Sequence, residues 1–270
     1  SLWLFSTTFF GLLLVINFDH PILPKESLAY IAIHAHLGLV GWFLLLVMGV
    51  GSRLIPMFLI SKYTNEKMLW AIYALVNTGL IVFILARVFN YAWEYPAIAF
   101  VLAAIILFGR HCYKAYTVRI RKAVDEQMKA SLLSVIQMLL PFAALIISIL
   151  ILPSSDHPNM ALLYGFCILF GWITAIILGM TFKTLPFIVW NKVYRKKAHA
   201  GKTPLPKDLF SEKIYHYMLL AYVTGFVVFL TGIVILNQWV LKLGAAALLM
   251  AAILYVFNTT KILTHQPGKI

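Results

Sequence analysis

The sequence predicts an all-α, polytopic membrane protein with about eight transmembrane helices. Hydrophobic residues make up 62% of the 270 residues, charged residues make up only 11%, and the mean hydropathy is +0.91. A soluble domain is about 45–50% apolar and about 25% charged. A soluble fold of this length has too little interior to bury so much apolar surface. The composition therefore excludes a soluble globular domain, a disordered chain and a disulfide scaffold.

Eight apolar stretches match the length of a membrane-crossing helix, which is about 20 residues. They lie at roughly 2–17, 28–58, 68–89, 96–112, 131–152, 160–188, 214–236 and 239–260. The first is short, and the second and sixth are long enough to tilt or to extend beyond the bilayer. The first stretch has no basic residues before it, unlike a signal peptide, so we expect either a processed chain or further residues upstream of Ser1.

The basic residues predict the orientation in the membrane. All 22 Lys and Arg residues except Lys25, Arg87 and Lys242 lie on one side of the predicted spans. Cytoplasmic loops of membrane proteins are enriched in Lys and Arg. We therefore expect a multi-pass protein of the bacterial inner membrane, with its C-terminus and a solvated 192–207 connection in the cytoplasm. The same rule explains the net charge of +13 without nucleic acid, so the expected partners are the lipid bilayer and other membrane subunits.

A pattern in the second span recurs in the sixth, 130 residues later. The matching positions are Gly41-Trp42, Gly49, Arg53 and Pro56 in the second span, and Gly171-Trp172, Gly179, Lys183 and Pro186 in the sixth. An Asp-His-Pro sequence precedes each of these spans, at 19–21 and 156–158. We therefore predict two pseudo-repeated four-helix units, residues 1–129 and 130–270, that have the same orientation in the membrane.

Two histidines occur in only one of the two units. His34 and His36 precede the first Gly-Trp pair, and the equivalent positions of the second unit hold Tyr164 and Phe166. Positions i and i+2 of a helix point about 200° apart, so the two imidazoles should face opposite sides of the span. Such a helix can present one ligand to each of two cofactors. The alternative is that both imidazoles only form hydrogen bonds within the helix bundle, because burying them without partners is unfavourable.

The stretch from His34 to Pro56, HAHLGLVGWFLLLVMGVGSRLIP, resembles the H-x-H…G-W helix of heme-copper oxidase subunit I. It looks most like the C-type oxidases and nitric oxide reductases, in which two such histidines bind hemes on opposite faces of one helix. The H-A-H start also resembles NnrS, a polytopic heme protein linked to nitric oxide stress. The resemblance implies a heme-binding protein, with heme b expected and copper as an alternative, in respiratory or nitric oxide-related electron transfer. A non-catalytic, oxidase-like scaffold subunit is the alternative function, and whether the protein is an enzyme stays open.

The sequence departs from the oxidases at their oxygen-reducing centre. It contains neither a His-His pair nor a His-Pro-Glu motif for copper, so we do not expect that centre. A transporter is a third class, but the acidic residues all lie in loops or at span ends, which leaves no intramembrane carboxylate.

Further candidates lie near the expected outer ends of the spans. His20 and His157, in the two Asp-His-Pro sequences, would complete a four-histidine heme or copper site with His34 and His36. Their alternative role is in loop and helix-cap structure. Arg87 is a candidate partner for a heme propionate, or for Glu94. At the opposite ends of the repeated spans, we expect Arg53 and Lys183 to extend toward the lipid headgroups and to interact with the helix C-termini.

Overall fold

The computed structural model describes residues 2–91, 94–120, 122–151, 158–195 and 203–266, and this part of the chain contains helices and no strands. Eight helices in the described part are long and apolar enough to cross a membrane. They are Leu2–Asp19, Ser27–Phe58, Glu66–Phe89, Tyr95–Thr117, Glu126–Ile146, Ala161–Tyr194, Glu212–Ile235 and Gln238–Leu263. The prediction of an all-α polytopic membrane protein is therefore confirmed. The orientation and the choice of membrane stay predictions.

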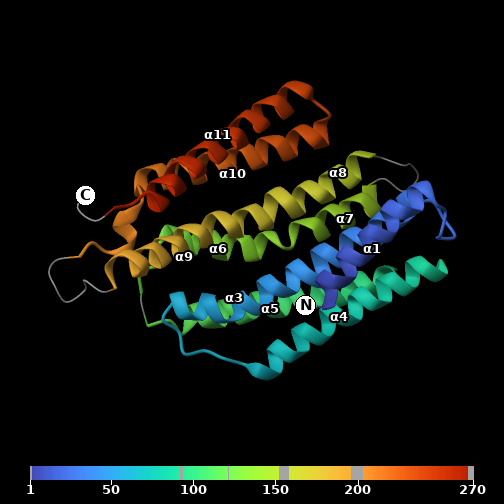
Figure 1. Ribbon diagram of the computed structural model, residues 1–270, viewed down its shortest axis with the longest axis horizontal. Helices are drawn as coiled ribbons and strands as arrows, with labels where there is room; N and C mark the ends of the chain where they lie inside the picture. Colours follow the sequence, from blue (N-terminus) through green and yellow to red (C-terminus); the bar gives the residue numbers. More distant parts are fainter. Residues whose placement is uncertain (1, 92–93, 121, 152–157, 196–202, 267–270) are drawn as a thin grey trace. The chain divides into compact units, whose positions relative to one another are not determined.

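The chain divides into two compact units, Ser1–Lys122 and Ala123–Ile270, and each holds four of these spans. The helices of the first unit (Figure 1) are α1 (Leu2–Asp19), α2 (Ile31–His36), α3 (Leu45–Phe58), α4 (Glu66–Phe89) and α5 (Glu94–Thr117). Those of the second are α6 (Glu126–Gln137), α7 (Leu140–Ile151), α8 (Pro158–Phe166), α9 (Thr174–Tyr194), α10 (Glu212–Ile235) and α11 (Gln238–Leu263).

The second and sixth spans each contain a π-helical segment. In the second span, η2 (Leu37–Leu44) joins α2 to α3, and in the sixth span η3 (Cys167–Ile173) joins α8 to α9. Each segment contains the Gly-Trp pair of its span. A π-turn widens the helix and changes the direction of the side chains beyond it, and such turns are frequent at functional sites. The two spans thus share a local irregularity, while the repeat of whole four-helix units stays a prediction.

The fifth span begins earlier than expected and is interrupted. Asp125 caps it, because its carboxylate accepts a hydrogen bond from the Met128 backbone N–H at 3.1 Å, and α6 therefore begins at Glu126 instead of near residue 131. Pro141 has no N–H to donate to the carbonyl of Gln137, and the helix breaks between α6 and α7 at Met138.

The sixth span extends beyond its predicted end. α9 continues to Tyr194, so the beginning of the expected 192–207 loop is helical. Tertiary contacts hold this extension. The Tyr194 hydroxyl lies 2.8 Å from Nε2 of His265, and the Trp190 indole donates to the Pro204 carbonyl at 2.5 Å.

Glycines let neighbouring helices approach closely. In the first unit, a Cβ on Gly79 of α4 would lie 3.0 Å from the Ala97 carbonyl oxygen of α5. In the second unit, a Cβ on Gly225 or Gly232 of α10 would lie within 2.9 Å of a backbone nitrogen of α11. Close backbone approach at small residues is typical of helix packing in membranes, where dispersion contacts replace the hydrophobic effect between helices.

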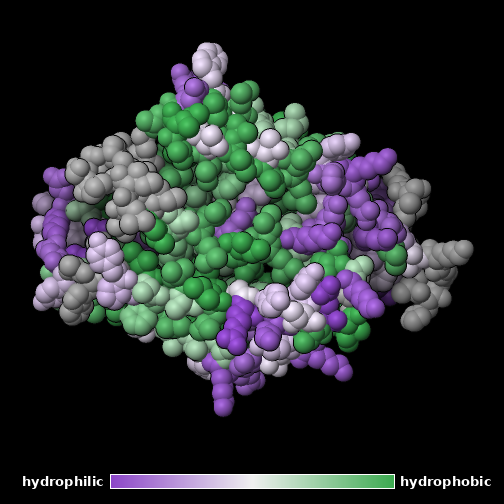
Figure 2. Space-filling model, turned by 180° about the vertical axis from the view of Figure 1, so that it is seen from behind, coloured by the Kyte–Doolittle hydropathy of each residue, from purple (hydrophilic) through white to green (hydrophobic). Residues whose placement is uncertain are grey.

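Large apolar side chains also cover the outside of the helices. Leu2, Trp70 and Trp239 are each at least 70% exposed. Figure 2 shows hydrophobic side chains over much of the visible face, with hydrophilic side chains in several separate places. A soluble monomer rarely exposes so many large apolar side chains, whereas lipid tails cover such side chains well.

Candidate cofactor site

Helix α1 packs along the second span and contacts the first of the two candidate histidines. Three pairs of residues make this contact, about one turn apart: Gly11 with His34, Thr7 with Gly38, and Trp3 with Gly41. The indole of Trp3 also donates a hydrogen bond of 2.8 Å to the side-chain oxygen of Asn77 on α4. The start of the second span is thus held between α1 and α4.

His34 faces α1. A Cβ on Gly11 would lie 2.8 Å from Cε1 of His34, so the imidazole would have to shift to accommodate any other residue at this position. The Nδ1 atom of His34 is buried and has no hydrogen-bond partner among the described residues. An unsatisfied buried polar atom costs about 1–3 kcal/mol, and a ligand or a water molecule at Nδ1 would remove that cost.

His36 contacts α4, so the two imidazoles face different helices, and their placement on opposite sides of the span stays a prediction. The centre of the His36 ring lies 4.5 Å from the centre of the Phe83 ring, and Nδ1 of His36 lies 2.8 Å from the Ala32 carbonyl oxygen. A neutral imidazole makes that contact by donating its Nδ1 proton, which leaves the lone pair on Nε2. Metal-binding histidines are commonly held in this way, with one ring nitrogen donating to a carbonyl and the other available to the metal.

Arg87 lies one turn beyond Phe83 on α4, and its guanidinium lies 5.7 Å from the centre of the Phe83 ring. The phenyl ring therefore contacts both His36 and Arg87. Arg87 is exposed, so its charge is accessible from outside the unit. Its predicted alternative partner, the Glu94 side chain, lies outside the described residues.

The predicted four-histidine site is tested only in part. His20 is exposed directly after the end of α1, and His157 lies outside the described residues. Within the described ranges, no three His, Cys, Asp or Glu residues are close enough together to hold a metal ion. The structure therefore does not gather His20, His34 and His36 into one such group.

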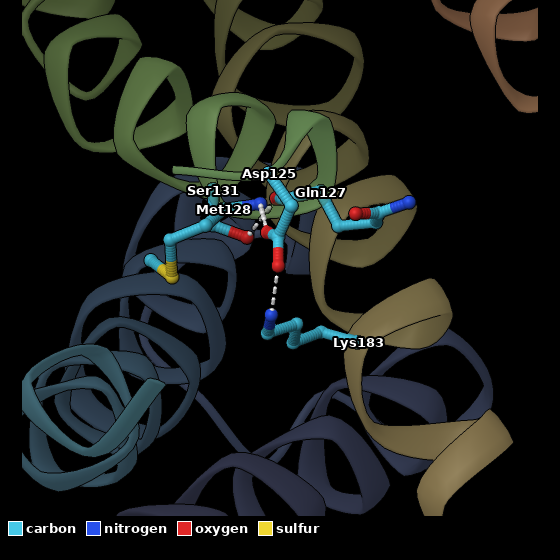
Figure 3. A network of polar contacts seen from close by, with 5 residues as sticks. All are labelled: Asp125, Gln127, Met128, Ser131 and Lys183. Atoms are coloured by element: carbon cyan, nitrogen blue, oxygen red, sulfur yellow. Dashed lines mark hydrogen bonds and ion pairs between the residues drawn. The ribbon is translucent and has the colours of Figure 1, made fainter. Parts of the chain in front are cut away.

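One expectation for a charged residue was wrong. Lys183 does not simply extend toward the headgroups, because its ammonium donates to the carboxylate of Asp125 in the second unit (Figure 3). The side chains of Lys183 and Asp125 are only 16% and 28% exposed. The pair forms because Asp125 caps α6, and α6 lies against α9 where Gly179 meets the backbone of Ser131. A sequence signal existed, since Asp125 directly precedes Glu126 at a helix start.

Sequence reasoning also missed a buried histidine in the first unit. The side chain of His111 on α5 is almost fully buried, and its Nε2 lies 3.4 Å from the Ser52 carbonyl of α3. Pro56 follows Ser52 by one helical turn and has no N–H, so this carbonyl lacks its usual helical donor. The centres of the Tyr63 and His111 rings lie 5.2 Å apart. The proline at position 56 is therefore the sequence signal that could have identified the Ser52 carbonyl as a partner for a histidine.

The π-segment of the second unit is held by a tyrosine. The Tyr222 hydroxyl of α10 lies 2.8 Å from the Phe170 carbonyl oxygen and 2.7 Å from that of Gly171. Its single proton can be shared between the two oxygens. This contact satisfies carbonyls that the irregular helical turn presents to α10, and it stabilises the π-segment.

No family model, curated protein or solved structure matches the chain. The resemblance of residues 34–56 to the oxidase helix and to NnrS therefore depends on those residues alone.

Proposed function

We propose that this protein is a heme-binding integral membrane protein of respiratory or nitric oxide-related electron transfer, with His36 as an axial ligand. The observation that carries the proposal is the 2.8 Å contact between Nδ1 of His36 and the Ala32 carbonyl. It selects the tautomer in which Nε2 can bind iron. A bound heme would supply one-electron chemistry.

The surrounding residues fit the tasks that such a ligand needs. Phe83 contacts the imidazole of His36 and limits its rotation. Arg87 lies one turn farther along α4, where its charge can neutralise a carboxylate such as a propionate. Helix α1 packs on His34, the other histidine of this span.

His34 has a lesser role in this proposal. Its ring packs against Gly11 of α1. Its Nδ1, which has no partner among the described residues, suits a small ligand or a water molecule.

The test is an absorption spectrum of the purified protein in its oxidised and reduced states, together with metal analysis. We expect a Soret band that shifts on reduction. His36→Ala should abolish the band, and His34→Ala should reduce it less. His216→Ala, at an exposed position of the second unit, is the matched control and should leave it unchanged. A His34→Ala/His36→Ala double variant that keeps the full heme spectrum would refute ligation by this helix.

A scaffold subunit is the second candidate. It is favoured by the packing of both imidazoles against neighbouring helices, His34 on α1 and His36 on α4. In that case the purified protein would be colourless and metal-free, and it would copurify with other membrane subunits. His36→Ala would then lower the thermal stability of the protein and leave its absorption spectrum unchanged.

A further inference from the structure

A pocket of about 470 Å³ lies between α3 and the first two turns of α4. Arg53 of α3 lines one side, and Glu66, Leu69, Trp70 and Tyr73 line the other. The four α4 residues have the spacing i, i+3, i+4 and i+7, so they form one face of that helix. The pocket is largely open to the surface, so it suits a group that stays partly exposed when bound.

The pocket contains one cation and one carboxylate that do not bind each other. Arg53 and Glu66 are both exposed, and among the described residues neither has an ion-pair partner. An arginine fork favours a phosphate, which it can bind through two hydrogen bonds. A carboxylate beside it repels an anion and attracts an ammonium group. The two charges therefore complement a ligand that carries both a phosphate and an ammonium.

The aromatic residues place the pocket at a membrane interface. Trp70 is 70% exposed and Tyr73 is 52% exposed. Their rings pack edge to face, with the ring centres 5.8 Å apart. Exposed Trp and Tyr at the ends of membrane helices sit at the level of the lipid headgroups. Leu69 lies on the same face and adds apolar surface beside the charges.

We propose that this pocket binds the headgroup of a zwitterionic phospholipid with a primary ammonium, that is, a phosphatidylethanolamine. Arg53 binds the phosphate, Glu66 accepts hydrogen bonds from the ammonium, and Trp70 and Tyr73 contact the start of the acyl chains. Phosphatidylglycerol lacks the ammonium, so the negative charge of Glu66 repels it. Phosphatidylcholine has a quaternary ammonium, which cannot donate a hydrogen bond. This inference does not depend on the proposed heme site.

The experiment is native mass spectrometry of the full chain, delipidated in detergent and offered equal amounts of the three lipids with identical acyl chains. We expect the wild type to retain one phosphatidylethanolamine in preference to the other two lipids. Arg53→Gln should weaken its binding about ten-fold, since it removes a charge-assisted hydrogen-bond donor. Glu66→Gln should abolish the preference over phosphatidylglycerol without weakening the binding of phosphatidylglycerol itself.

The controls separate this pocket from general charge effects. Lys67→Gln removes a positive charge beside Glu66, outside the pocket lining, and should change nothing. Arg53→Lys keeps the charge and should weaken binding less than Arg53→Gln. Soluble glycerophosphoethanolamine, added at the lipid concentration, should not displace the lipid. The proposal is overturned if the wild type binds all three lipids equally, if Lys67→Gln weakens binding as much as Arg53→Gln, or if the soluble headgroup displaces the lipid.

Discussion

Gly49 and Gly179 occupy equivalent positions of the repeated pattern, yet the structure predicts opposite effects when each is changed to alanine. Around Gly49, which is exposed on α3, no atom of the described residues beyond its own stretch of helix lies within 4 Å of an added Cβ. At Gly179, which is buried on α9, an added Cβ would lie 2.8 Å from the Ser131 backbone nitrogen and 2.9 Å from the Gln127 carbonyl oxygen. Real Cβ atoms do not approach backbone atoms so closely, so α6 and α9 would have to separate.

The magnitudes follow from these distances. Alanine is about 0.8–1 kcal/mol better than glycine inside a helix, so Gly49→Ala should stabilise the protein by about 0.5–1 kcal/mol. Gly179→Ala has the same intrinsic gain, but overpacking against a backbone costs about 1–3 kcal/mol. Separation of α6 from α9 also weakens the contact of Lys183 with Asp125. The net result should be a loss of roughly 1–2 kcal/mol for Gly179→Ala.

Both variants can be measured by reversible SDS titration in mixed micelles, followed by far-ultraviolet circular dichroism. The free energies of unfolding should change in opposite directions, and the helical signal before the transition should be the same for all three proteins. If Gly179→Ala is as stable as Gly49→Ala, the close approach of α6 and α9 is refuted. If Gly49→Ala is as unstable as Gly179→Ala, the open space around Gly49 is refuted.

Two further predictions use the same assay. Asp125→Asn keeps an N-cap acceptor but leaves the Lys183 ammonium without its carboxylate, and it should cost about 1–3 kcal/mol; Asp125→Ala also loses the cap and should cost about 1 kcal/mol more. Equal losses for the two variants would show that the cap contributes nothing. Tyr222→Phe leaves the carbonyls of the π-segment without their donor and should cost about 1–2 kcal/mol. Tyr217→Phe, at an exposed position of the same helix, should stay within about 0.5 kcal/mol of the wild type, and a comparable loss in both would contradict this role of Tyr222.

The candidate site shows how far local sequence information reaches. The spacing of His34 and His36 predicts that they face opposite sides of their span, since that depends only on helical geometry. It does not predict that His34 packs on Gly11 or that His36 contacts Phe83, because those neighbours come from other helices. The contact between Nδ1 of His36 and Ala32 lies within one turn, but the choice of rotamer that makes it depends on the packing of α4.

The sequence by itself determined the helical class and the number of spans. Those properties follow from the length and hydropathy of single segments, because the bilayer fixes both for any helix that crosses it. Tertiary structure alone decided which of two matching glycines is a helix contact, and which of two matching cations, Arg53 or Lys183, has a carboxylate partner. The residues themselves are alike in each pair, so the difference lies in the neighbours: α6 brings the Ser131 backbone and Asp125 to α9, whereas the corresponding glycine of α3 stays exposed and Arg53 lines an open pocket.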